Sequence, residues 1–179
     1  AHDLIVEQGI EGLSARSQAR FLSSVRGFYN YVVQERLLDA NPLALIEAPR
    51  LSRRLPSLLS EREVLRLLAA PDPGQPRGLR DLAMIHTMYA AGLRVSETIG
   101  LGLTDLDLRA GFVAALGKGR KRRLVPIGEP ARQSLQRYLA EVRGRWAAAG
   151  CRALFVTERG TGMTRQGFWK LLKRYGRAA

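Results

Sequence analysis

The segment GKGRKRR, residues 117–123, is the part of the sequence best suited to binding an anion. Gly117 and Gly119 allow a tight turn and a close approach of the backbone to a ligand. The segment also carries five cations in six positions: Lys118, Arg120, Lys121, Arg122 and Arg123. It is not a P-loop, because Gly-x-x-x-x-Gly-Lys-Ser/Thr is absent and the turn leads into a strand-like run. Such a turn either binds phosphate or is the solvated basic tip of a hairpin.

Arg94 is the second residue of chemical interest, because it lies in the otherwise apolar segment MYAAGLRVSETIGL, residues 88–101. A buried guanidinium must be paired, and Glu97 at i+3 is the nearest candidate partner, with Asp81 as another. Glu97 would orient the guanidinium and leave its outer N–H donors for an anion. The alternative is an ion pair that only stabilises a short helix.

Metal-dependent chemistry has less support in the sequence. Cys151 is the single cysteine, and it cannot form a Cys/His zinc site with two separated histidines. Asp105 and Asp107 in TDLDL, together with Lys118, would suit a Mg²⁺-dependent nuclease, but TDLDL is also typical of a capped turn. We therefore expect no cofactor and no metal. A lone cysteine also rules out an internal disulfide and fits a cytoplasmic location.

Charge is distributed unevenly along the chain. Residues 1–50 contain 5 arginines against 6 acidic residues, whereas residues 51–179 contain 24 Lys and Arg against 10 Asp and Glu. A strongly basic segment attracts polyanions, of which nucleic acid is the commonest. Solubilising charge is the alternative, although 25 arginines against 4 lysines also suits bidentate phosphate binding.

The first 50 residues predict a helical unit. Ser14 can cap a helix that continues to about Leu38 and is ended by DANP, residues 39–42. Residues 49–57, PRLSRRLPS, have two prolines and three arginines without periodicity, which indicates a linker. The residues expected to face a core recur at helical spacing: Ala15, Ala19, Leu22, Val25, Tyr29 and Val32.

Residues 58–179 predict helices around a small antiparallel sheet, which is a mainly α fold of the α+β class. Ser60 and Glu63 have the spacing of a capping box, and Thr164 can cap the last helix. No apolar run is long enough to span a bilayer, so no membrane insertion is expected. The expected helices between these caps cover residues 79–91 (with Gly92 as C-cap), 94–101 and 129–149, and the expected strands cover residues 112–116, 124–127 and 153–157.

Three segments, AAGLRVSETIGL, LGKGRKRRLVPIG and MTRQGFWKLLKRYG, occur in this order over residues 90–176. Together they resemble the bacterial tyrosine recombinases of the phage integrase family, most closely the XerD/XerC group that resolves chromosome dimers. SQARFLSSVRGFYNYV, residues 17–32, extends the resemblance over nearly the whole chain. The resemblance implies that residues 1–48 are the C-terminal part of an all-α core-binding domain. It also implies that residues 58–179 are the N-terminal part of a recombinase catalytic domain.

The resemblance implies a mechanism without a metal or a high-energy cofactor. A tyrosine hydroxyl attacks a DNA phosphodiester and forms a 3′-phosphotyrosyl link with release of a 5′-hydroxyl. Arg94 corresponds to the first of the family's two catalytic arginines, and Glu97 to the acidic residue that supports it. Lys118 corresponds to the hairpin lysine that protonates the departing 5′-oxygen. Cations suit this chemistry because charge builds up on the non-bridging oxygens.

By the family's spacing, the His-x-x-Arg box, a later His or Trp and the nucleophilic tyrosine follow Ala179, so we expect the chain to be an internal fragment. Tyr175 has helical spacing from Phe168 and Leu171 and is expected in the core. The other tyrosines are expected on apolar helix faces: Tyr29, Tyr31, Tyr89 and Tyr138. We therefore expect the fragment to bind DNA weakly and not to cleave it.

Further cations are expected to contact the DNA backbone or, alternatively, to form solvated faces. They are Arg16, Arg20, Arg120, Lys121, Arg122, Arg123, Arg165, Lys170 and Lys173. The resemblance implies that the intact protein works in a tetramer with a second Xer-type recombinase. It also implies double-stranded DNA with a dif-like site and an FtsK-type translocase as partners. A non-enzymatic DNA-binding or architectural module is the alternative.

Overall fold

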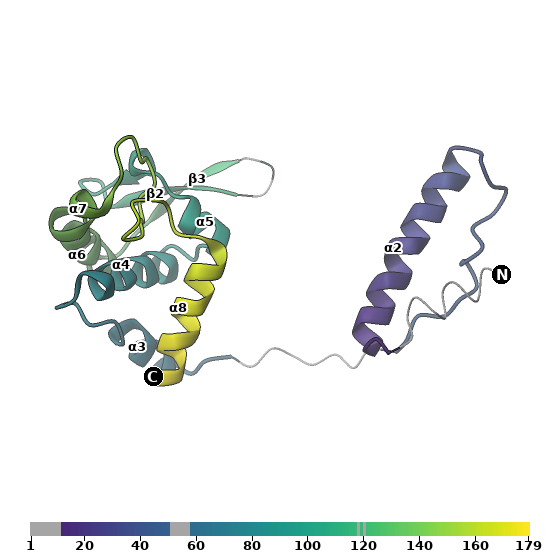
Figure 1. Ribbon diagram of the computed structural model, residues 1–179, viewed down its shortest axis with the longest axis horizontal. Coiled ribbons are helices and arrows are strands. Elements are labelled where there is room, and N and C mark those ends of the chain that lie inside the picture. Colours follow the sequence, from purple (N-terminus) through teal and green to yellow (C-terminus); the bar gives the residue numbers. More distant parts are fainter. Residues whose placement is uncertain (1–11, 51–57, 118, 120) are drawn as a thin grey trace. The chain divides into compact units, whose positions relative to one another are not determined.

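The computed structural model describes residues 12–50, 58–117, 119 and 121–179. The chain divides into two compact units, residues 1–57 and residues 58–179 (Figure 1). Most of the expected linker lies outside the described residues. No helix in the described parts is both long and apolar enough to cross a membrane.

The first unit is built on helix α2, Ala15–Gln34, whose N-terminus is capped as predicted by Ser14. Leu22 of α2 and Leu43 are its buried apolar residues, and Val25, Tyr29 and Ile46 pack against them. The predicted end of the helix near Leu38 is wrong. Arg36 adopts a φ of 60°, and its amide and that of Leu37 donate back to the carbonyls of the last turn. This left-handed turn ends the helix before the DANP segment.

The second unit is mainly helical with a three-stranded antiparallel sheet, as the sequence predicts. Its elements are α3 (Glu61–Ala69), α4 (Pro76–Ala90), α5 (Val95–Gly100), η1 (Leu103–Asp105), β1 (Leu106–Asp107), β2 (Phe112–Leu116), β3 (Arg122–Pro126), α6 (Glu129–Tyr138), the π-helical turn η3 (Leu139–Arg143), α7 (Gly144–Trp146) and α8 (Arg165–Ala178). The predicted caps at Ser60 and Thr164 are confirmed, since each side chain accepts an amide hydrogen from the first turn.

The sheet has the order β1-β2-β3, and β2 and β3 form the predicted hairpin around the basic turn. Val113 and Ala115 of β2 are fully buried, so this strand fixes the hairpin to the core. The third strand predicted over residues 153–157 is wrong, because that segment forms only isolated bridges, at Ala153 and Val156. The buried guanidinium of Arg143 binds the carbonyls of Ala153 and Leu154 in place of a neighbouring strand.

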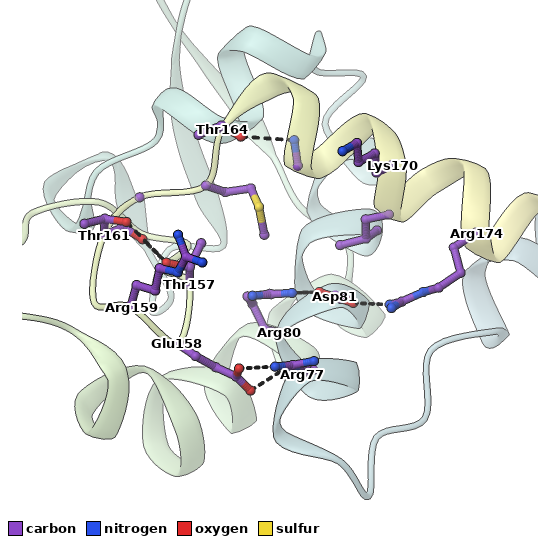
Figure 2. A pocket seen from close by; sticks show the side chains of 14 residues that line it. Arg77, Arg80, Asp81, Thr157, Glu158, Arg159, Thr161, Thr164, Lys170 and Arg174 are labelled. Atoms are coloured by element: carbon purple, nitrogen blue, oxygen red, sulfur yellow. Dashed lines mark hydrogen bonds and ion pairs between the residues drawn. The ribbon is translucent and has the colours of Figure 1, made fainter.

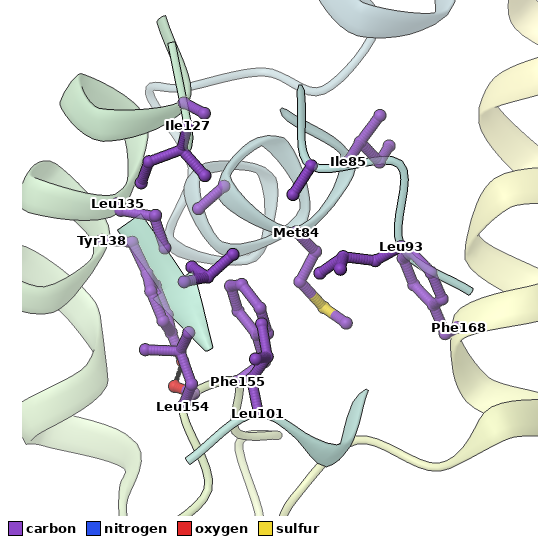
Figure 3. Packing of buried hydrophobic residues seen from close by; sticks show 14 of the residues in the cluster. Met84, Ile85, Leu93, Leu101, Ile127, Leu135, Tyr138, Leu154, Phe155 and Phe168 are labelled. Carbon is purple, nitrogen blue, oxygen red and sulfur yellow. Dashed lines mark hydrogen bonds between the residues drawn. The ribbon is translucent and has the colours of Figure 1, made fainter. Parts of the chain in front are cut away.

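Helix α4 runs through the middle of the apolar core of this unit. Figure 3 shows Met84 of α4 at the centre, with Leu135 and Tyr138 on the α6 side and Phe168 on the α8 side. In Figure 1, α8 passes along the side of the unit and reaches α3, and the two helices are in contact. Burial on this scale fixes α4, and with it the turn that follows α4, in space.

The turn after α4 is formed by Gly92, which has a φ of 55°. Its amide and that of Leu93 donate to the carbonyls of Tyr89 and Met88, which makes a Schellman motif. The prediction that Gly92 caps the C-terminus of this helix is confirmed, although α4 covers Pro76–Ala90 and so begins earlier than residue 79. Since Leu93 is buried, Arg94, the next residue, is placed at the surface of the core.

The helix predicted over residues 129–149 ends early, at Trp146. It passes through a π-helical turn, and then Ala147 becomes extended. The amide of Ala148 donates to the carbonyl of Gly160 instead of continuing the helix. A contact between residues so far apart in the sequence overrides the local helical pattern.

Candidate functional site

Arg94 is the residue at the N-terminus of α5, directly after the Schellman turn. The expectation that it is partly buried is wrong, because 69% of its side chain is exposed. The backbone there is extended, before the first helical turn, while the apolar neighbours Leu93 and Leu101 fill the core. The guanidinium is therefore accessible to a ligand, and folding does not bury its charge.

Glu97 lies beneath Arg94, with only 5% of its side chain exposed. Its Oε2 accepts the backbone N–H of Arg94 at 2.8 Å, and its Oε1 accepts Nη1 of Arg94 at 3.1 Å. The predicted Arg94–Glu97 pair is confirmed. The backbone N–H of Arg94 lowers the pKa of the Glu97 carboxyl below its usual value, and the side chains of Arg94 and Arg123 lower it further against the opposing effect of burial. Glu97 is thus an anion at neutral pH.

Arg123 of β3 is the second cation on Glu97, because its Nη2 donates to Oε2 at 3.1 Å. The structure thereby joins the basic hairpin to the helix that follows Arg94. A cavity of about 180 Å³ lies between α5 and the hairpin, lined in part by Glu97 and Leu116. Lys118 and Arg120, which the sequence singled out on the same hairpin, lie outside the described residues.

Asp105 and Asp107 are structural residues of the turn around β1. Oδ2 of Asp105 accepts the amide of Gly102 at 2.9 Å, and Oδ1 of Asp107 accepts the amides of Arg109 and Ala110, each at 2.9 Å. The capped turn expected from TDLDL is confirmed. Among the described residues, no group of three or more Asp, Glu, His or Cys side chains is arranged to hold a metal ion.

A second cationic site is a cleft of about 550 Å³ between α4, α8 and residues 157–164 (Figure 2). Arg80, Asp81 and Arg174 lie in line across it. The cations that line it are Arg77, Arg80, Arg159, Lys170 and Arg174, against the two acidic residues Asp81 and Glu158. Of the predicted DNA-contact residues of α8, Lys170 faces this cleft, whereas Nζ of Lys173 lies 3.9 Å from the ring centre of Trp169.

Asp81 is the fully buried anion of this cleft. Its Oδ1 accepts from Arg80 at 2.8 and 2.5 Å, and its Oδ2 accepts Nη2 of Arg174 at 3.0 Å. The expectation that Asp81 is a partner of Arg94 is therefore wrong. The cleft was not predicted from the sequence, although the adjacent Arg80–Asp81 pair inside an apolar helix was a signal for it.

The remaining predicted contacts are exposed cations. Arg16 and Arg20 are exposed on α2 in the first unit, and Lys121 and Arg165 are exposed in the second. Arg122 of β3 is 60% exposed and pairs with Asp105. Each of these side chains can reach a polyanion.

The five tyrosines have different environments. Tyr138 is fully buried, and its hydroxyl donates to the carbonyl of Leu154 at 3.2 Å. Tyr175 packs against the core as expected, and its hydroxyl is bound to Asp81. The expectation that the others lie on apolar faces is wrong for Tyr31 and Tyr89, which are 57% and 63% exposed.

Comparisons with known proteins agree with this architecture. The family model described as "Phage integrase family" matches residues 57–179. The tyrosine recombinase XerD of Pseudomonas aeruginosa is 48% identical over 172 residues, which cover 94% of this chain and 57% of that protein. XerD of Neisseria meningitidis serogroup B is 41% identical over 182 residues, covering 99% of this chain and 61% of that protein.

Among solved structures, the XerH site-specific recombinase bound to its difH substrate superposes with a TM-score of 0.76 at 20% identity. The match covers 98% of this chain and 52% of that one, and it establishes the fold. The chain spans about 57–61% of the length of the two curated relatives.

Proposed function

The chain belongs to the phage integrase family of tyrosine recombinases. On this basis we propose that it is part of an XerD-like site-specific DNA recombinase. The observation that carries the proposal is the pairing of the exposed Arg94 guanidinium with a buried carboxylate, beside a basic hairpin. This arrangement fixes a cation at the surface before a substrate arrives, as transition-state stabilisation requires.

The reacting group would be one phosphodiester of double-stranded DNA. A tyrosine phenol gives up its proton to a base, and its oxygen forms a bond to phosphorus while the bond from phosphorus to the 5′-oxygen breaks. Arg94 neutralises the charge that accumulates on the non-bridging oxygens. The ammonium of Lys118 gives its proton to the departing 5′-oxygen, so that a hydroxyl leaves rather than an alkoxide.

Binding to the rest of the DNA would rest on the exposed cations of both units. We assign to this role the predicted set Arg16, Arg20, Arg120, Lys121, Arg122, Arg123, Arg165, Lys170 and Lys173, and Arg159 of the cleft. Residues 1–48 would be the end of a helical core-binding domain, and residues 58–179 the first part of the catalytic domain. A second Xer-type recombinase in a tetramer and an FtsK-type translocase are the proposed protein partners, by resemblance.

The proposal is tested with a chain extended to the length of the curated relatives. On a nicked suicide duplex carrying a dif-like site, this protein should form a covalent protein–DNA adduct, and EDTA should not prevent it. Arg94→Ala should abolish the adduct while leaving most DNA binding. Binding without any adduct would indicate an architectural DNA-binding protein instead, and dependence on added Mg²⁺ would indicate a nuclease.

A further inference from the structure

We propose that the cleft between α4, α8 and residues 157–164 is a clamp for one phosphate of the DNA backbone, and that Arg174 is its central donor. The inference rests on the proposed function and deepens it, because Arg174 is not among the predicted DNA contacts. It follows from the way in which a buried carboxylate holds this arginine.

The guanidinium of Arg174 is held at one nitrogen only. Its Nη2 donates to Oδ2 of Asp81 at 3.0 Å and to the hydroxyl of Tyr175 at 2.9 Å. Its central carbon lies 4.6 Å from the centre of the Tyr175 ring. Nε and Nη1 have no hydrogen-bond partner among the described residues, and 61% of the side chain is exposed. These donors are therefore fixed in direction and accessible to an oxyanion.

The same arrangement surrounds Arg94. Each of the two arginines pairs an exposed guanidinium with a buried carboxylate, Glu97 for Arg94 and Asp81 for Arg174. Ordering an arginine before its ligand arrives lowers the entropic cost of binding. Arg80 differs from both, because it is buried and each of its guanidinium nitrogens donates to Asp81 or to a backbone carbonyl. Arg80 therefore neutralises Asp81, and Arg174 is left to neutralise a ligand.

The walls of the cleft carry more positive than negative charge. Five cations against two carboxylates give a net charge of +3, and each carboxylate is paired with an arginine of α4. The excess charge lies on Arg159, Lys170 and Arg174. Figure 2 shows Arg159 on one side of the cleft, with Lys170 and Arg174 on the other. A phosphate between the two walls would thus be contacted from both sides.

DNA suits this cleft better than a protein segment does. Among the described residues that line it, only Met163 and Leu171 have large apolar side chains, whereas protein partners depend on apolar or aromatic anchors. Phosphate oxygens accept hydrogen bonds from arginine and lysine side chains. Arg159 and Lys170 already belong to the proposed DNA-binding set, so DNA bound by them would pass beside Arg174 in the same cleft.

The first experiment compares Arg174→Gln with Arg177→Gln in the chain extended to the length of the curated relatives. Each variant removes one positive charge from α8, but Arg177 is exposed on the last turn and does not line the cleft. Arg174→Gln should weaken DNA binding by roughly 10- to 100-fold, because charged hydrogen bonds to a phosphate are lost. Arg177→Gln should weaken it much less. Arg174→Lys should restore only part of the affinity, since an ammonium lacks the planar fork of donors.

A scan of the duplex with uncharged methylphosphonate linkages tests whether a single phosphate is held. Each linkage is replaced in turn, and fluorescence anisotropy gives the affinity of wild type and of Arg174→Gln. At the clamped linkage, wild type should lose roughly 10-fold or more in affinity. Arg174→Gln should lose no more there than at other linkages, because non-additivity of this kind marks a direct contact.

Glu158→Gln should give a gain of affinity, which misfolding cannot imitate. The hydrogen bonds from Arg77 lower the pKa of the Glu158 carboxyl below its usual value, so this carboxylate is an anion of the cleft at neutral pH. Its removal should raise DNA affinity by roughly 2- to 5-fold, as expected for an exposed charge. Glu141→Gln is the matched control with a smaller expected gain, because Glu141 pairs with Arg137 on α6 and η3.

The clamp is overturned if Arg174→Gln and Arg177→Gln bind DNA equally well, if no linkage is coupled to Arg174, or if Glu158→Gln binds no better than Glu141→Gln. Inorganic phosphate that raises the melting temperature of wild type but not of Arg174→Gln, without any coupled linkage, would also overturn it, because the cleft would then hold a free phosphate. Wild-type protein that meets all of these expectations but forms no covalent adduct would overturn the recombinase function and leave the clamp standing.

Discussion

The hydroxyl of Tyr175 on α8 donates a 2.9 Å hydrogen bond to Oδ2 of Asp81 on α4, a residue 94 positions earlier in the chain. The same oxygen accepts Nη2 of Arg174, and the other oxygen of the carboxylate holds Arg80. A fully buried anion thus fixes α8 to α4. Because α8 carries Lys170, this contact also sets one wall of the cationic cleft.

Removal of the Asp81 charge should destabilise the protein strongly. Asp81→Asn leaves Arg80, which is 8% exposed, without its anion. The free energy of unfolding, measured by urea denaturation of the 179-residue chain, should fall by about 3–5 kcal/mol. Tyr175→Phe removes the hydrogen bond that the hydroxyl donates to Asp81 and the one that it accepts from Arg174, and should cost about 1–2 kcal/mol. Similar losses for the two variants would contradict the central role of the carboxylate.

The 179-residue chain should bind DNA without forming a covalent adduct. Tyr138 is buried, and burial raises the pKa of the Tyr175 hydroxyl above its usual value, with the Asp81 charge acting in the same direction. The hydroxyls of Tyr138 and Tyr175 are therefore poorly suited to lose a proton and attack phosphorus. Denaturing gel electrophoresis after incubation with a nicked duplex provides the measurement. An adduct that persists in Tyr175→Phe but disappears in a variant of another tyrosine would identify an unexpected nucleophile.

The contribution of Glu97 to stability should depend on pH. Its pKa is lowered in the folded protein, chiefly by the backbone N–H of Arg94. A lowered carboxyl pKa stabilises the fold fully above the ordinary value of 4.5 and loses that effect as the pH falls through the folded-state pKa. The difference in free energy of unfolding between wild type and Glu97→Gln should therefore be largest near neutral pH and shrink on acidification. A difference that grows in acid would refute this assignment.

DNA binding should weaken steeply with salt, and the cleft should account for part of the slope. Arg159 and Lys170 are exposed residues of the cleft. If each contacts one phosphate, its replacement by alanine should reduce the slope of log K against log salt concentration by about 0.9. Fluorescence anisotropy with a short duplex gives this slope, and Arg137→Ala is the matched arginine control. An unchanged slope in both cleft variants would place the DNA elsewhere.

Gly92→Ala should destabilise the turn that places Arg94. Gly92 has a φ of 55°, and an added Cβ would meet no atom within 4 Å, so the cost comes from the backbone alone. A left-handed alanine should lower the free energy of unfolding by about 1–2 kcal/mol. Gly176→Ala is the contrast, because Gly176 lies in α8 with open space around it and should be neutral or stabilising. Thermal unfolding of both variants would separate the two effects.

Local signals in the sequence were sufficient for much of the fold. The caps at Ser60 and Thr164, the turn at Gly92 and the basic hairpin depend on residues close together in the chain. The Arg94–Glu97 pair was also predictable from its i+3 spacing. Such contacts form within one or two turns, so the residue types alone determine them.

The features that the sequence did not reveal depend on distant residues. Arg123 and Glu97 are brought together by the packing of the hairpin on α5, and Asp81 meets Arg174 through the packing of α8 on α4. The segment ALFVT has the composition of a strand, but side chains from η3 and α6 bind its backbone. The spacing of apolar residues along the sequence does not indicate which distant residues such side chains will contact.

Arg143 of the π-helical turn donates to the carbonyls of Cys151, Ala153 and Leu154. A carbonyl presents the same acceptor whichever side chain is attached to the residue. A substitution of the exposed side chain of Arg152, which lies in this stretch, would therefore leave these acceptors in place. The conformation of this stretch depends instead on Arg143, and the residues next to Arg143 in the sequence do not indicate this role.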